Sequence, residues 1–307
     1  MPPGLALGVF AFLLFAPGVF VLGPLAGLLL VARPVSRQGW LWLLAGLAWT
    51  AGWLTRTGDL TGQFTRAFAV VLLGVWLILL LIRPGHAFGR SLLATALALA
   101  VTFGWLLALG LRWGDLEAAV GRSLSDLLLR QAHGIGQLGG GDGEGVSTAF
   151  FEVAGQARWL AALYPAGLVI AAVVGLMLAW RTHFWIVRRP LGPAPQPFAA
   201  FTFSDHLVWL LVLAAVLLLV PADPRLDGLR TAGSNVLLVA LVLYAVRGAA
   251  VLRATTGRLS TPAAVAALLV VLFMFVFVAS GLALLGLADT WLDFRRRAAP
   301  TTGGVSP

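Results

Sequence analysis

The sequence lacks cysteine and lysine altogether, and it contains only four histidines. Without cysteine the chain can form neither a disulfide bond nor a thiolate metal site. The histidines lie far apart and show no zinc-binding spacing, so we expect them in loops or at interfaces and predict no metal site. Only 11% of the residues are charged. A soluble protein of this length would need a more polar surface, so the composition excludes an ordinary soluble domain.

Long apolar stretches of about 14 to 29 residues fill most of the chain, and 60% of all residues are hydrophobic. Hydrocarbon offers no hydrogen-bond partners, so each stretch must satisfy its own backbone as a helix. The predicted spans run over residues 5–32, 39–54, 67–82, 91–111, 159–180, 205–220, 229–252 and 262–287. The predicted fold class is therefore all-α, a polytopic transmembrane helical bundle with about eight spans, or nine if Pro17-Gly18 splits the first. We expect a single transmembrane domain over residues 1–297 and a disordered tail over 298–307.

The long connection between spans, residues 112–158, is predicted to be amphipathic. From Trp113 onward apolar residues recur at spacings of three and four, and charged residues occupy the opposite side. This apolar stripe is too narrow to span hydrocarbon, so we expect a helix lying flat on the outer membrane surface. A flexible hinge is predicted at Gly139–Gly145, with a second short amphipathic stretch near residues 150–160. A movable lid and a plain surface helix both fit this pattern.

The loop arginines indicate an orientation. Nine lie on one side of the predicted spans, where Asp205 is the only acid, and eleven lie on the other side with the remaining eleven acids. The positive-inside rule counts basic residues, so the two sides are nearly equal. We place the protein in the bacterial inner (plasma) membrane with its acid-poor side facing the cytoplasm. This orientation puts the long loop outside. The basic run Arg295-Arg296-Arg297 argues against it. The net charge of +9 indicates contact with anionic membrane lipid and no nucleic acid.

Several polar residues are predicted at membrane depth. Arg247 lies near the end of an apolar helix. It either extends to the lipid headgroups, the interpretation we favour, or pairs with Asp205 or a carbonyl inside the bundle. Asn235, earlier in the same helix, is expected to hydrogen-bond to a neighbouring helix. Asp289 and Asp293, followed by arginines, are expected to form local ion pairs at a helix end.

No catalytic motif stands out. Gly134, Gly136 and Gly139 have dinucleotide-binding spacing but follow an amphipathic helix instead of a strand, so no cofactor is expected. Ser204-Asp205-His206 resembles a catalytic triad only in composition, because consecutive side chains cannot form its hydrogen-bond relay. We expect the protein not to be an enzyme.

The C-terminal half resembles the YybS-like family of uncharacterised bacterial membrane proteins. The resemblance rests on short motifs in a fixed order over residues 159–297: Tyr164-Pro165-Ala166, Arg188-Arg189-Pro190, Phe203-Ser204-Asp205-His206, Asn235-Val236, Arg247-Gly248 and Gly286-Leu287-Ala288-Asp289. Arg247 stands where the family's pattern has glutamine.

That family is similar in helix arrangement to the substrate-binding S components of energy-coupling-factor transporters, which implies a small-molecule ligand and a membrane protein partner. Two hypotheses remain open. In the first, the protein is a transporter-like binding subunit. Its candidate binding or structural polar residues are Tyr164, Asp205, Trp209, Asn235, Arg247 and Asp289. In the second, it is a non-transporting membrane scaffold whose arginine-rich loops recruit a cytoplasmic partner or anionic lipid.

Overall fold

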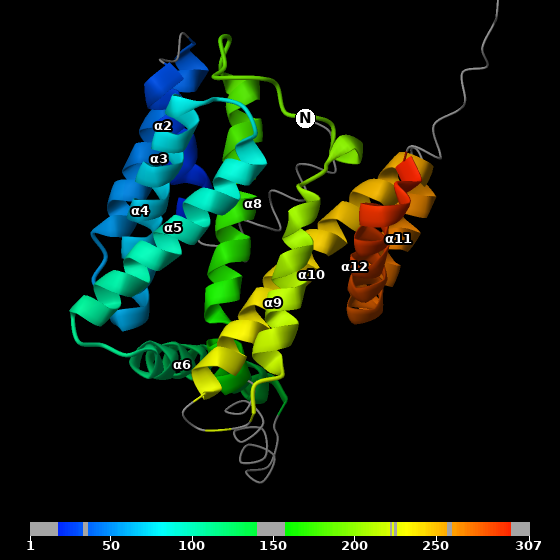
Figure 1. The fold of residues 1–307 in the computed structure, drawn as a ribbon. Helices are drawn as coiled ribbons and strands as arrows, with labels where there is room; N and C mark the ends of the chain where they lie inside the picture. Colours follow the sequence, from blue (N-terminus) through cyan, green and yellow to red (C-terminus); the bar gives the residue numbers. More distant parts are fainter. Residues whose placement is uncertain are drawn as a thin grey trace, which may run out of the picture. The chain divides into compact units, whose positions relative to one another are not determined.

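The computed structural model describes residues 18–32, 36–139, 157–221, 223, 226–256 and 260–295. The secondary structure of this described part is helical, with no strand, so the predicted all-α fold is confirmed. The chain divides into two compact units, Met1–Pro195 and Gln196–Pro307, which we call the N-terminal and C-terminal units. Figure 1 shows the helices of both.

The N-terminal unit contains α2 (Val19–Ala32), α3 (Arg37–Leu54), α4 (Leu60–Ile82), α5 (Ala87–Ala108), α6 (Trp113–Gly139) and α8 (Tyr164–Ile186). Short polar side chains fix where two of these helices begin. Ser36 Oγ accepts a hydrogen bond from the Gly39 N–H at 3.0 Å, and Asp59 Oδ1 accepts one from the Gly62 N–H at 3.0 Å. Each satisfies a first-turn backbone donor that has no partner within the helix.

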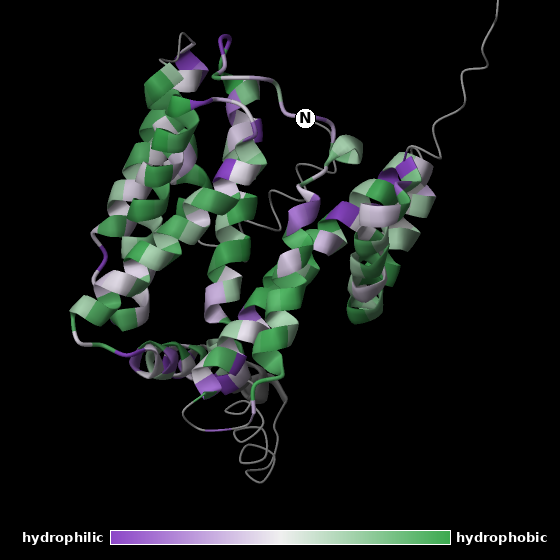
Figure 2. Cartoon of the chain, in the orientation of Figure 1, coloured by the Kyte–Doolittle hydropathy of each residue, from purple (hydrophilic) through white to green (hydrophobic). Residues whose placement is uncertain are grey.

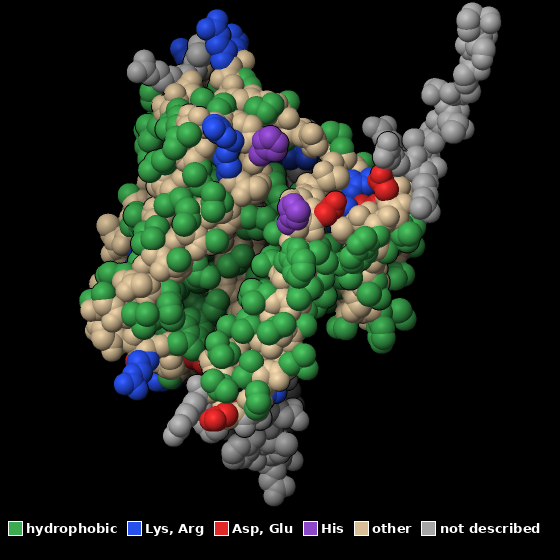
Figure 3. Space-filling view, viewed as in Figure 1, with side chains coloured by type: hydrophobic (Ala, Val, Ile, Leu, Met, Phe, Trp, Pro, Cys, Tyr) green, Lys and Arg blue, Asp and Glu red, His purple; other side chains and the backbone are tan. Residues whose placement is uncertain are grey.

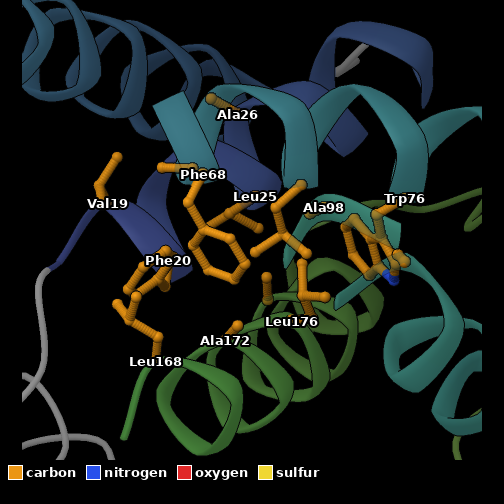
Figure 4. Packing of buried hydrophobic residues seen from close by; sticks show 14 of the residues in the cluster. Val19, Phe20, Leu25, Ala26, Phe68, Trp76, Ala98, Leu168, Ala172 and Leu176 are labelled. Atoms are coloured by element: carbon orange, nitrogen blue, oxygen red, sulfur yellow. The ribbon is translucent and has the colours of Figure 1, made fainter. Parts of the chain in front are cut away.

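The core of the N-terminal unit is built around α2. Ten of the 14 residues of α2 are buried, and the helix packs against α3, α4 and α8. Phe20 and Phe68 of α4 form an edge-to-face contact, with ring centroids 5.8 Å apart, and both belong to the same cluster as Leu176 of α8 (Figure 4). A Cβ on Gly175 would lie 2.6 Å from the Phe20 carbonyl oxygen. The missing side chain of Gly175 therefore lets α8 approach α2 closely.

Five helices are long and apolar enough to cross a membrane: α4, α5, α8, α10 (Asp227–Thr256) and α12 (Phe275–Leu292). A span needs about 20 residues to cross roughly 30 Å of hydrocarbon. Shorter apolar helices occur at Val19–Ala32 and Asp205–Leu218. Hydrophobic residues make up most of the helices in both units (Figure 2), as expected for helices that lipid surrounds.

The predicted amphipathic helix is confirmed as α6, which lies across the ends of α4 and α5 (Figure 1). Its apolar side is buried by protein: Leu116 and Val120 belong to the core of the N-terminal unit. Ser123 Oγ also donates to Asp59 Oδ2 at 2.6 Å, which ties α6 to the first turn of α4. These contacts hold α6 against the unit. Its position at a membrane surface stays a prediction.

The C-terminal unit contains two short 3₁₀ helices, η1 (Phe198–Ala200) and η2 (Asp205–Leu207), followed by α9 (Val208–Leu218), α10, α11 (Thr261–Phe273) and α12. Helix α10 is central, because α9, α12 and η1 all pack against it. In Figure 1, α10 and α12 run in the same direction. Helix α11, which connects them in the sequence, runs in the opposite direction.

Two predictions about the spans need comment. One uninterrupted span over residues 262–287 is wrong, because Met274 separates α11 from α12. The apolar run contains no glycine, proline or polar turn residue at this point, so the sequence carries no signal for the break. The first part of the predicted span 5–32, most of the hinge at 139–145, residues 150–156 and the tail at 298–307 lie outside the described residues.

Candidate functional site

Four charged side chains meet at one end of the C-terminal unit, and we call them the charge network: Asp205, Arg247, Asp289 and Arg295. Arg247 Nη1 donates to Asp205 Oδ1 at 2.9 Å, and Arg247 Nε donates to Asp289 Oδ2 at 3.1 Å. Arg295 Nη2 donates to the same oxygen of Asp289 at 2.8 Å. Two carboxylates balance two guanidiniums. Acidic and basic groups gather at this end of the unit, next to a largely apolar surface (Figure 3).

Separate elements supply the members of the network. Asp205 begins η2, just before α9, and Arg247 lies in the C-terminal half of α10. Asp289 lies in the last turn of α12. The residue after α12, Asp293, has a left-handed conformation with φ of 45°. Such a residue ends a helix and changes the chain direction, which allows Arg295 to reach back to Asp289.

Arg247 is buried by the protein. Its side chain is 7% exposed, and its guanidinium lies over the Phe203 ring, 5.2 Å from the centroid. The favoured prediction, in which Arg247 extends to the lipid headgroups, is therefore wrong. The alternative pairing with Asp205 is present, and Asp289 is a second partner that the sequence did not indicate. A buried charge needs such partners, because burying an isolated charge costs several kcal/mol.

Asp289 is the most buried member of the network, with a side chain 2% exposed. Its Oδ2 accepts from both arginines, whereas Oδ1 has no hydrogen-bond partner in the described part of the chain. Arg295 also donates through Nη1 to the Phe201 carbonyl at 2.9 Å. It thereby fastens the end of α12 to the segment before α9. The predicted local ion pair between Asp289 and a following arginine is present, but it is one half of a longer-range network.

A close helix crossing brings Arg247 within reach of Asp289. A Cβ on Gly248 would collide with the Leu282 carbonyl oxygen, and a Cβ on Gly286 would collide with the Tyr244 carbonyl oxygen. Only glycine allows the two backbones to touch here, and small residues commonly permit such contacts between membrane helices. The signal in the sequence is the pair Arg247-Gly248 together with Gly286 three residues before Asp289.

Comparison with known proteins places this architecture in a family. Residues 5–290 match the model of a family described as "Predicted membrane protein (DUF2232)". The chain belongs to this family. The match covers almost the whole sequence, and the description agrees with the apolar helices seen here. No curated protein and no solved structure matches the chain.

Three of the six predicted site residues lie outside the charge network. The Asn235 side chain donates to the Thr231 carbonyl of its own helix at 2.8 Å, and it lies twelve residues before Arg247, about 18 Å along α10. Trp209 of α9 is 66% exposed. The Tyr164 hydroxyl hydrogen-bonds to the Thr65 hydroxyl within the N-terminal unit. The network therefore unites Asp205, Arg247 and Asp289 of the six predicted residues.

A buried histidine was missed by sequence reasoning. His183 of α8 is fully buried, and its ring stacks on Trp180 with centroids 6.0 Å apart. In the described part of the chain, neither ring nitrogen has a hydrogen-bond partner. His183 therefore lies in a helix and not in a loop, and a position at the membrane interface stays a prediction. Its position in the last turn of α8, three residues after a tryptophan, gave only a weak signal of burial.

The guanidiniums of the network are groups that can recognise an anion. A guanidinium can bind a carboxylate or a phosphate through parallel hydrogen bonds. Arg247 has one deeply buried partner, Asp289, and one partner whose side chain is 65% exposed, Asp205. The network therefore contains one fixed carboxylate and one carboxylate that is accessible from outside the unit.

Proposed function

We propose that the protein is the ligand-binding subunit of a small-molecule transporter and that the charge network binds an anionic group of the ligand. The observation that carries the proposal is the asymmetry of the ion pair between Arg247 and Asp205. The side chain of Arg247 is 7% exposed, and that of Asp205 is 65% exposed. Ionisable residues at membrane depth commonly mark paths or sites for ligands.

The exchange of Asp205 for a ligand anion costs little in this arrangement. An incoming carboxylate or phosphate replaces Asp205 on Arg247 Nη1, while Asp289 stays bound to Nε. Arg247 is never left without a partner, so the large penalty of an unpaired buried charge is avoided. The side chain of the released Asp205 is already 65% exposed, so its carboxylate can be hydrated by water after the exchange.

The transport role is also supported by the resemblance to the YybS-like family and, through it, to S components of energy-coupling-factor transporters. In this proposal the protein is a multi-pass protein of the bacterial inner membrane. The acid-poor face, whose loops carry nine arginines, lies in the cytoplasm in this proposal.

Native mass spectrometry of the gently purified protein tests the proposal. We expect the wild-type protein to carry a small molecule with a carboxylate or phosphate group, and the Arg247→Gln variant to lack it. Arg230→Gln is the matched control, because Arg230 is an exposed arginine in the first turn of the same helix. A wild-type protein that never carries a small molecule would overturn the proposal.

The second candidate function is a membrane scaffold that recruits anionic lipid or a cytoplasmic partner. Exposed arginines favour it: Arg188 and Arg189 follow α8 directly and are both exposed. Basic residues near the membrane surface contribute about 1 kcal/mol each to binding of anionic lipid. In the same mass spectra, retained anionic lipid or a soluble protein, in place of a small molecule, would support this function.

A further inference from the structure

Helix α11 is too short to cross a membrane. Its 13 residues span about 20 Å, whereas the hydrocarbon is roughly 30 Å thick. It ends at Phe273, and Met274 is the single non-helical residue before α12 begins. The chain therefore changes direction before α11 could reach the opposite side of the membrane.

The contacts of α12 show where its C-terminal end lies. Arg295 donates to the Phe201 carbonyl, which belongs to the segment before α9, and Asp289 binds Arg247 in the second half of α10. The end of α12 is thus at the same end of the unit as the start of α9 and the end of α10 (Figure 1). The start of α10 is at the other end.

The crossing of α10 and α12 gives the depth of the turn. Gly286 meets Gly248, and Phe275 lies eleven residues earlier, about 16 Å along α12. Helix α10 continues from Gly248 back to Asp227, about 31 Å in the same direction. The turn at Met274 therefore lies roughly level with Leu237, about 15 Å from the start of α10, which is itself about 45 Å long.

The turn is apolar, unlike an ordinary connection in water. We call residues Phe273–Phe277 the apolar tip. Its five side chains are all large and hydrophobic and are between 57% and 82% exposed. Met274 N–H donates to the Val270 carbonyl at 2.8 Å, and Val278 N–H donates to the Met274 carbonyl at 2.9 Å. These bonds belong to the last turn of α11 and the first turn of α12, so Met274 alone interrupts the helical backbone.

We infer that α11 and α12 form a re-entrant hairpin that enters and leaves the membrane on the face where α10 ends, with its apolar tip among lipid acyl chains. The C-terminus then shares a face with Arg253 at the end of α10. Arg295 and the two arginines that follow it in sequence are then assigned to that face instead of the opposite one. The acid-poor face then carries twelve loop arginines instead of nine, and the opposite face carries eight instead of eleven. The positive-inside rule now favours the orientation that the C-terminal arginines had opposed.

Cysteine labelling tests the hairpin, and the natural absence of cysteine gives a clean background. Three variants of the full chain are compared with a membrane-impermeant maleimide in intact and permeabilised cells: Gly228→Cys, Thr256→Cys and Ser306→Cys. Gly228 and Thr256 are exposed at opposite ends of α10. We expect Ser306→Cys to label from the same side as Thr256→Cys, and Gly228→Cys from the other side. Ser306→Cys labelling with Gly228→Cys would overturn the hairpin.

A spin label on Phe275→Cys, in the protein reconstituted into phosphatidylcholine and phosphatidylglycerol vesicles, tests what surrounds the tip. We expect access to dissolved oxygen, which concentrates in acyl chains, and exclusion of a water-soluble nickel chelate. The label on Thr256→Cys is the control and should show the opposite preference. Access to nickel at Phe275 would place the turn in water and overturn insertion. Exclusion of both reagents would show a protein surface over the tip, such as a second copy, and would overturn contact with lipid.

Discussion

Gly248 of α10 and Gly286 of α12 meet backbone to backbone where the two helices cross, one residue after Arg247 and three residues before Asp289. A Cβ at either position would collide with a carbonyl oxygen of the other helix. The crossing sets the distance between α10 and α12. This distance determines whether the Arg247 side chain can reach Asp289. Packing and electrostatics in the C-terminal unit therefore depend on the same two residues.

We predict that Gly286→Ala lowers the stability of the protein by about 1–3 kcal/mol or more, because the extra methyl group cannot be accommodated against backbone. The measurement is the midpoint of thermal unfolding in detergent. Gly281→Ala is the matched control in the same helix, since a Cβ there meets nothing within 4 Å. Equal midpoints for the two variants would contradict the close crossing.

Arg247→Lys should also destabilise the protein, by about 1–3 kcal/mol. Arginine uses two differently directed nitrogens, Nη1 for Asp205 and Nε for Asp289, and one ammonium cannot reproduce that geometry. Arg230→Lys, in the exposed first turn of α10, should leave the unfolding midpoint unchanged. If both lysine variants melt like the wild type, Arg247 is not held by the two carboxylates.

The contact between α4 and α6 should weaken in acid. The hydrogen bond from Ser123, followed by the one from the Gly62 N–H, lowers the pKa of Asp59 below its usual range. A lowered pKa stabilises the fold above the pKa of the unfolded chain, about 3.9, and this contribution disappears as pH falls through the folded value. Asp59→Ala should cost about 0.5–2 kcal/mol at neutral pH, as loss of a helix cap does.

Unfolding midpoints of wild type and Asp59→Ala, measured between pH 7 and pH 3, check this prediction. We expect the difference between the two midpoints to be constant above the unfolded pKa, about 3.9, and to shrink as pH falls below it. A difference that stays constant over the whole range would mean that the charge of Asp59 plays no part.

Ser91→Ala should destabilise the N-terminal unit by about 1–3 kcal/mol, because Trp76 Nε1 would lose its buried hydrogen-bond partner at 3.0 Å. Both residues are fully buried. The double variant Trp76→Phe with Ser91→Ala should cost less than the sum of the two single changes. Additive costs would contradict the coupling.

Much of the fold was predictable from local sequence patterns. Apolar runs placed helices α3, α4, α5, α8 and α10, and the spacing of Leu116 and Val120 with charged residues opposite identified α6. The start of α4 was predicted too late, at residue 67, because the cap at Asp59 that fixes the start at Leu60 was not considered. These features depend on neighbours within a few residues, which a sequence displays directly.

The charge network and the hairpin were less accessible. Arg247 and Asp289 are 42 residues apart in sequence, and no local period reports how two helices are aligned. Arg247-Gly248 and Gly286 carried part of the signal, but their meaning depends on the two glycines meeting. The turn at Met274 is set by packing within a continuous apolar run, so sequence patterns predicted one span there.

The central claim is that Asp205 is an exchangeable partner of Arg247, and a comparison of anion responses tests it most directly. Thermal unfolding of wild type, Asp205→Asn and Arg247→Gln is followed while acetate, succinate or inorganic phosphate is titrated at constant ionic strength. The account predicts that at least one anion stabilises Asp205→Asn more strongly than wild type, because the competing carboxylate is gone, and that Arg247→Gln does not respond. Equal responses of all three proteins would contradict it.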